Sequence, residues 1–137
     1  MLIRYESEHE LSGNNAIRCE RCNRLGAHTL YSHIEKYANF ALFQFPRFNF
    51  IKGESPNEVK VVKNNKSVYL PYNITLNDKN YTLACTIHHS GSYKSGHYYV
   101  VIATSGGFMK INNEIIISMK NFSPTTICGC LYILREE

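Results

Sequence analysis

The chain has 137 residues, of which 44% are hydrophobic and 19% are charged, a composition typical of a globular domain rather than of a disordered segment. Its net charge of +4 is spread without a run of lysines or arginines, which gives little basis for nucleic-acid binding. No apolar stretch reaches the roughly 20 residues that cross a bilayer, and the first residues lack the pattern of a signal peptide. We expect one domain, cytoplasmic or nuclear, without membrane or nucleic-acid partners.

A turn signal at residues 13–15 precedes a Cys-x-x-Cys pair, Cys19 and Cys22. The odd total of five cysteines argues against a disulfide framework and favours reduced thiols or metal ligands. Tetrahedral zinc takes four ligands, and this pair supplies two of them. His28 and His33 are within sequence reach, so three alternatives stay open: a site of two cysteines and two histidines, a relic half-site, and a site shared with another chain. Apart from this incomplete zinc site, we expect no cofactor.

The remaining elements are predicted to be β-strands, because no helical period follows Phe40 and apolar residues alternate with polar ones. Any helix is expected to be short and near the beginning of the chain. The turn 63–66 is expected to join two short strands. The predicted strands are 41–45, ended by Pro46, and 59–62, 67–72, 81–88, 97–104, 108–111, 115–117 and 127–134. The pattern predicts a largely antiparallel sheet.

Two histidines, His89 and His97, flank a Gly/Ser loop, and the pair Asn112 and Asn113 follows one strand later. A thiol becomes a good nucleophile when an imidazole accepts its proton, and a third polar group holds that imidazole in one tautomer. The arrangement therefore fits the base and the orienting group of a cysteine hydrolase. The alternative is that His97 is an ordinary polar residue at a strand start. Gly96 favours the catalytic interpretation, because glycine lets another backbone segment approach the imidazole closely.

No cysteine is evident as the nucleophile of this arrangement. In the simplest register of the histidine hairpin, Cys85 lies opposite Val100, three residues from His97. Residues three apart point to opposite faces and lie roughly 10 Å apart along a strand, so we expect Cys85 to belong to the core. Cys128 and Cys130 lie in an Ile/Leu-rich strand and are expected to be small buried hydrophobic residues.

The segment 81–98 resembles the histidine box of the ubiquitin-specific proteases, papain-like cysteine peptidases that remove ubiquitin. The family pattern is Y-x-L-x-A-x-x-x-H-S-G-x-x-x-x-G-H-Y, followed by a strand and by an aromatic residue shortly before an N-D or D-D pair. Phe108 stands where tryptophan is usual, and Asn112 begins the pair that supplies the third catalytic member. The matching residues of the box are Tyr81, Leu83, His89, Ser90, Gly91, Gly96, His97 and Tyr98.

The resemblance extends over nearly the whole chain. Residues 8–22 resemble the segment that leads into the second zinc knuckle of the family's fingers, residues 34–48 resemble a segment that ends in Arg-Phe, and residues 127–134 resemble the closing strand. The fold implied by the resemblance is of the α+β class, with a predominantly antiparallel palm and a partial fingers element across residues 1–137.

The resemblance also implies roles for individual residues. His97 is expected to be the general base and then the general acid, with Asn112 orienting it and Asn113 in support. An asparagine orients the imidazole by a neutral hydrogen bond and stabilises imidazolium less than a carboxylate does. The expected substrate is ubiquitin or a ubiquitinated protein, cleaved after the ubiquitin C-terminal glycine. The residues expected to contact the ubiquitin tail are His89, Tyr93, Gly96 and Tyr98.

One departure from the family pattern concerns the nucleophile. In the family, the nucleophilic cysteine lies in an N-terminal thumb before the fingers, whereas no cysteine precedes Cys19 in this sequence. The chain is therefore interpreted as the C-terminal half of such a domain, inactive alone, with a thumb supplied from elsewhere or lost. Two alternatives stay open: a catalytically inactive ubiquitin-binding or scaffold module, and a zinc-knuckle nucleic-acid binder. The second lacks base-stacking aromatics interleaved with a basic patch.

Overall fold

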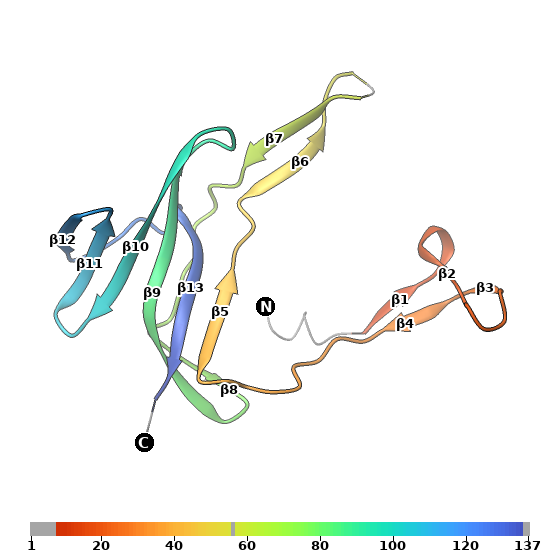
Figure 1. Cartoon of the computed structure of the whole chain (residues 1–137), viewed down its shortest axis with the longest axis horizontal. Helices are drawn as coiled ribbons and strands as arrows, with labels where there is room; N and C mark the ends of the chain where they lie inside the picture. Colours follow the sequence, from red (N-terminus) through yellow and green to blue (C-terminus); the bar gives the residue numbers. More distant parts are fainter. Residues whose placement is uncertain (1–7, 56, 136–137) are drawn as a thin grey trace. The chain divides into compact units, whose positions relative to one another are not determined.

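The structure, a computed structural model, describes residues 8–55 and 57–135 (Figure 1). It divides into two compact units, one up to Lys36 and one from Tyr37 onward. The only helix among the described residues is a 3-10 turn at Gly13–Asn15, and none is long and apolar enough to cross a membrane. The predicted antiparallel sheet is confirmed, and the helical part of the α+β class amounts to this turn.

Two short antiparallel strand pairs make up the first unit, β1 with β4 and β2 with β3. Cys19 and Cys22 lie in the turn between β2 and β3, which is closed by the Asn23 amide donating to the Cys19 carbonyl at 2.8 Å. None of the described side chains of this unit is buried, so backbone hydrogen bonds rather than a core define its shape. The strands are β1 (His9–Leu11), β2 (Ile17–Arg18), β3 (Leu25–Gly26) and β4 (His28–Leu30).

A seven-stranded antiparallel sheet forms most of the second unit, in the order β12-β11-β10-β9-β13-β5, with β8 also paired to β9. A separate hairpin, β6 with β7, follows β5 (Figure 1). The strands are β5 (Phe40–Gln44), β6 (Phe48–Lys52), β7 (Val59–Lys63), β8 (Asn73–Leu76), β9 (Lys79–Gly91), β10 (Gly96–Thr104), β11 (Gly107–Asn112), β12 (Ile115–Met119) and β13 (Ile127–Leu134).

The core lies against one face of the three central strands. Val101, Thr86 and Cys130 are cross-strand partners on β10, β9 and β13, and each is fully buried. Tyr132 is buried beside this row, and its hydroxyl donates to the Pro71 carbonyl at 2.6 Å. This hydrogen bond attaches the irregular segment around Pro71 to the sheet.

The buried Arg47 links three parts of the second unit. Its side chain is 5% exposed, and its guanidinium donates to four backbone carbonyls instead of to a carboxylate. Charged donors form stronger hydrogen bonds than neutral ones, so the arginine fixes the irregular segments that follow β7 and precede β13. The accepting carbonyls belong to Asn64, Lys66, Pro124 and Ile127.

The strand prediction is wrong in several places, since β8 and the four strands of the first unit were not predicted. Residues 67–72 form no strand, because Arg47 and a backbone bond from Val68 to Pro124 engage this region and its neighbours in place of a ladder. β7 instead pairs with β6, which was not predicted as a strand. The pairing is closed by the Gly53 amide, which donates to the Glu58 carbonyl at 2.8 Å.

Candidate catalytic hairpin and its groove

The hairpin of β9 and β10 carries the histidine box at its tip. Ser90 lies opposite His97, and the pairing continues to Gly91 opposite Gly96. Gly91 has a φ of 102°, a conformation that glycine adopts readily, and the Ser92 amide donates to the Ser95 carbonyl at 2.7 Å. The four residues between the glycines thus form a closed turn at the end of the sheet.

The observed register differs from the predicted one by two residues. Cys85 lies opposite Ile102 instead of Val100, because pairing extends further into the Gly/Ser loop than its composition indicated. A shift of two residues leaves every side chain on the same face. The conclusion drawn from the predicted register therefore holds, although the register itself was wrong.

His97 and Asn112 are brought together by the pairing of β10 with β11. The register sets Val101 opposite Lys110, which makes Asn112 a diagonal neighbour of His97 on the same face. His97 Nε2 donates to Asn112 Oδ1. Because an amide oxygen only accepts hydrogen bonds, this bond places the proton on Nε2 and leaves a lone pair on Nδ1. The His97 side chain is exposed and that of Asn112 half-buried.

Asn113 occupies the two-residue turn between β11 and β12, next to the Asn112–Ile115 pair. Its φ is 54°, a left-handed conformation that asparagine tolerates better than most residues. The side chain is exposed. The structure thus brings Asn112, and not Asn113, to the imidazole, and a supporting role for Asn113 stays a prediction.

His89 lies on the opposite face of the hairpin and is 4% exposed. Its ring packs against Tyr98, with ring centroids 4.6 Å apart, and against Phe48 at 5.4 Å. A Cβ at Gly96 would collide with the His89 imidazole. A Cβ there would also meet the backbone carbonyl of Ser90, the cross-strand partner of His97, at 2.7 Å. The glycine therefore makes room both for His89 and for the backbone opposite His97, as its position had indicated.

The imidazole of His89 has an unmet hydrogen-bonding group. Its Nδ1 is buried and has no partner among the described residues, and an unpaired buried polar atom is unfavourable. Burial, and then the charge of Lys63, lowers the pKa of His89, so the ring is neutral at neutral pH. It borders an open groove of about 230 Å³, which is lined by Gln44, Phe45, Pro46, Arg47, Phe48, His89, Tyr98 and Cys128.

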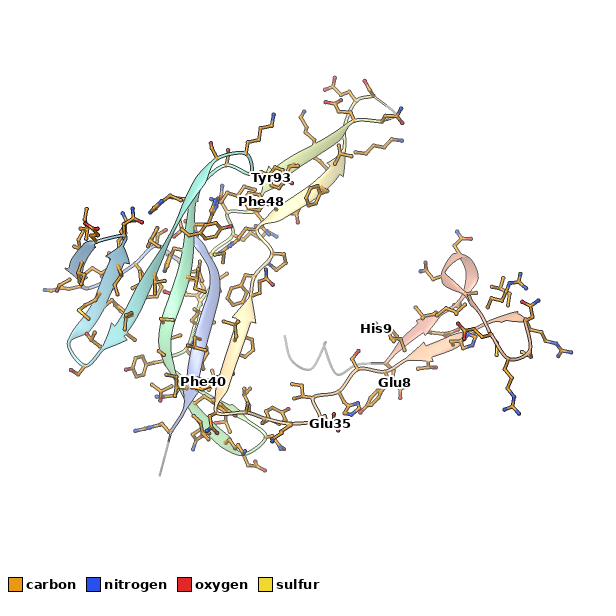
Figure 2. The ribbon with its side chains drawn as sticks, viewed as in Figure 1. Glu8, His9, Glu35, Phe40, Phe48 and Tyr93 are labelled. Carbon is orange, nitrogen blue, oxygen red and sulfur yellow. The ribbon has the colours of Figure 1, made fainter. Side chains whose placement is uncertain are left out.

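Tyr93, at the tip of the turn, extends this aromatic surface. Its ring makes an edge contact with Phe48 at 5.5 Å (Figure 2). A second edge contact joins it to Phe50 at 5.8 Å. The predicted substrate-contacting residues thus separate by role. His89 and Tyr98 line the groove, Gly96 makes space for His89, and Tyr93 lies over the hairpin of β6 and β7.

The cysteines of the second unit are poorly placed to serve His97. Cys85 pairs with Ile102, five residues from His97, so it is on the opposite face and about 17 Å along the strand. Cys128 and Cys130 lie on β13, which β9 separates from β10. Burial raises the pKa of all three thiols, and that of Cys130 to about 11. Such thiols carry little thiolate at neutral pH.

In the first unit, the pKa of the Cys19 thiol is lowered instead of raised. The Cys22 amide, then the Cys22 side chain, lowers its pKa through hydrogen bonds, as suits a metal-ligating thiolate. His28 donates from Nδ1 to the Gly26 carbonyl at 3.0 Å, and His33 stacks on a tyrosine. Among the described residues no three histidine, cysteine or acidic side chains gather as metal ligands. The residues present fit half of a tetrahedral site.

Comparisons with known proteins concern the family and the fold. The chain is similar to one chain of a solved structure of the SAGA DUB module with Ubp8, Sgf11, Sus1 and Sgf73, bound to monoubiquitin, at 20% identity and a TM-score of 0.65. The match covers 98% of this chain and 32% of the other, so this chain spans about a third of its length. Comparison with curated proteins gives no significant match.

A family model gives the assignment. The model of ubiquitin carboxyl-terminal hydrolases matches residues 9–126, which include both strand pairs of the first unit and the hairpin with His97 and Asn112. The resemblance to the ubiquitin-specific proteases is thereby confirmed, and the structural match supports their fold. The chain belongs to the ubiquitin carboxyl-terminal hydrolase family.

Proposed function

We propose that the chain supplies the histidine and its orienting amide to a thiol-dependent deubiquitinase, which hydrolyses the isopeptide or peptide bond after the ubiquitin C-terminal glycine. The observation that carries this proposal is the hydrogen bond from His97 Nε2 to Asn112 Oδ1. It fixes the tautomer that a general base needs and directs the basic Nδ1 away from the orienting group.

The reaction uses this imidazole twice. His97 Nδ1 accepts the proton of a cysteine thiol, and the thiolate attacks the glycine carbonyl to form a tetrahedral intermediate. The imidazolium then gives its proton to the leaving amine, and a thioester forms. His97 next accepts a proton from water, the resulting hydroxide attacks the thioester, and ubiquitin leaves with a free carboxylate as the thiol regains its proton. Asn112 keeps the ring in place by a neutral hydrogen bond.

The three cysteines of the second unit do not supply the nucleophile. Cys85, Cys128 and Cys130 are separated from His97 by the sheet geometry and have raised pKa values. A thiol carried by a thumb, on the same polypeptide or on a separate chain, would have to approach the exposed side of His97. We also propose that Cys19 and Cys22 contribute two thiolates to a structural zinc site. Tetrahedral zinc takes four ligands, so the other ligands would lie beyond the described residues.

The groove beside His89 fits an extended ubiquitin tail. The imidazole of His89 offers a buried Nδ1 that lacks a partner, and a peptide backbone in the groove would supply one. Tyr98 is 60% exposed beside it and provides an aromatic wall for such a peptide.

Two experiments test the proposal. In NMR titrations, monoubiquitin should shift the amide signals of residues 89–98, and ubiquitin lacking its last two glycines should bind more weakly. A ubiquitin probe with a C-terminal electrophile should give no adduct with the chain alone. It should give one after a thumb fragment with a nucleophilic cysteine is added, and His97→Ala should abolish it.

The outcomes of these experiments distinguish a catalytic role of the chain from a role in ubiquitin binding alone. Binding of ubiquitin without any probe adduct, with and without the thumb fragment, would leave the chain as a ubiquitin-binding module. An adduct on Cys85, Cys128 or Cys130 of the isolated chain would contradict the assignment of the nucleophile.

A further inference from the structure

Two backbone carbonyls at the hairpin tip lack a strand partner. β13 pairs with β9 only as far as Ile127 opposite His88, and the His89 amide then donates to the Thr126 carbonyl at 2.9 Å. In an antiparallel strand, alternate residues direct their amide and carbonyl groups to the same side. The carbonyls of His89 and Gly91 therefore point to the side on which β13 has ended.

Lys63, the last residue of β7, takes the place of the missing strand. Its ammonium donates to the His89 carbonyl at 3.0 Å and to the Gly91 carbonyl at 2.8 Å. Hydrogen bonds from a charged donor are shorter and stronger than neutral ones, and an ammonium can satisfy several carbonyls at once. One side chain thus replaces two bonds of a ladder.

The two carbonyls bound by Lys63 lie on either side of the residue that pairs with His97. Between them lies Ser90, whose cross-strand partner is His97. The four residues of the turn beyond are all exposed, so none of them anchors this end of the strand in the core. The edge contacts of Tyr93 with Phe48 and Phe50 join the same two hairpins (Figure 2), and the ammonium is the polar part of this junction.

We propose that Lys63 is a positioning residue for His97: it holds the carbonyls on both sides of Ser90 and thereby fixes the strand pair from which the His97 imidazole reaches Asn112. This inference rests on the proposed function of the His97–Asn112 pair. Lys63 acts through the backbone of the hairpin. Its loss leaves two carbonyls to water and lets the tip of the hairpin open.

The test compares three variants of the full chain by NMR. Lys63→Met removes the donors, Lys63→Arg retains a cation with several donors, and Lys60→Met is the matched control, because Lys60 is exposed on the same strand opposite Ile51. The measurements are amide hydrogen exchange of residues 89–98, with β11 as an internal reference, and the tautomer and pKa of His97 from imidazole ¹⁵N shifts.

Lys63→Met should raise exchange at the hairpin tip by about tenfold relative to β11, the size expected for losing partly exposed charged hydrogen bonds. It should also lower the fraction of His97 with the proton on Nε2. Lys63→Arg should stay within about twofold of the parent, and Lys60→Met should not differ from it. If Lys63→Met does not fold, Lys63→Leu serves in the same comparison, because it also lacks donors.

Two results would overturn the inference, and they differ in what they say of the proposed function. A parent chain with the Nε2 tautomer, in which Lys63→Met behaves like Lys60→Met, would refute the role of Lys63 alone. A parent chain whose His97 lacks the Nε2 proton would refute the hydrogen bond from His97 to Asn112, and with it the positioning role of Lys63.

Discussion

The stability of the second unit should fall in mild acid because of His88. This side chain is fully buried, with 0% exposure, and its Nε2 and Nδ1 lie 2.7 Å and 2.9 Å from the hydroxyls of Thr86 and Thr126. Its ring stacks on Tyr99 with centroids 4.8 Å apart. Burial, and then the charges of Lys110 and Arg47, lowers the pKa of His88 to about 4.

The sign of the effect follows from the two protonation states. The pKa of His88 is lower in the folded chain than its unfolded value of about 6.5, so the unfolded chain binds this proton more readily. Stability is then fully present above pH 6.5 and is lost as the pH falls toward 4. The two pKa values differ by about 2.5, which corresponds to about 3 kcal/mol in the free energy of unfolding. By pH 5, about 2 kcal/mol of this stability should be lost.

Urea unfolding between pH 7 and pH 5, followed by tyrosine fluorescence, measures this loss. His88→Gln should remove most of the pH dependence, while part remains because burial and Lys63 also lower the pKa of His89. His33→Gln, an exposed position in the first unit, should keep the parent slope. The reasoning is refuted if the parent chain has equal free energies of unfolding at pH 7 and pH 5, or if His88→Gln retains its slope.

Two further predictions concern close packing and thiol reactivity. Gly96→Ala should destabilise the hairpin by about 2 kcal/mol or more in urea unfolding, because a Cβ there meets the His89 ring. As the control, Gly106→Ala meets no atom and should be nearly neutral. Equal effects of the two substitutions would contradict the close approach of His89 to Gly96. Iodoacetamide at pH 7 should alkylate exposed Cys22 before buried Cys130, and mass spectrometry showing the reverse order would contradict their assigned environments.

Much of the fold could be predicted because the relevant signals are local. β9, β10 and β13 show apolar alternation over many residues, and short turns connect β9, β10, β11 and β12 in sequence. His97 and Asn112 lie on adjacent strands joined by one such turn, so their proximity follows from neighbouring segments. The family match confirms the family, and the catalytic roles of the pair stay a proposal.

The features that escaped prediction depend on contacts distant in sequence. Arg47 satisfies carbonyls up to 80 residues away, and nothing in the residues around 67–72 shows that this prevents a strand. Lys63 has the appearance of any lysine on a hairpin, and its function depends on where β13 ends. The predicted register of the β9–β10 hairpin was wrong because pairing continues to Gly91 opposite Gly96, which the Gly/Ser composition of the loop does not indicate.

The proposed choice of His97 as the base rests on its environment, because His88 lies on the same face of the hairpin, two residues from the cross-strand partner of His97. His88 pairs across the sheet with Tyr99, and His97 pairs with Ser90. Threonine hydroxyls occupy both nitrogens of His88, and its lowered pKa keeps it neutral, so it cannot accept a proton from a thiol at neutral pH. His97 is exposed, and one of its two ring nitrogens, Nε2, is engaged in the hydrogen bond to Asn112. Under the proposed function, His88 is therefore an uncharged part of the support, and the proton transfer is assigned to His97, near the start of β10.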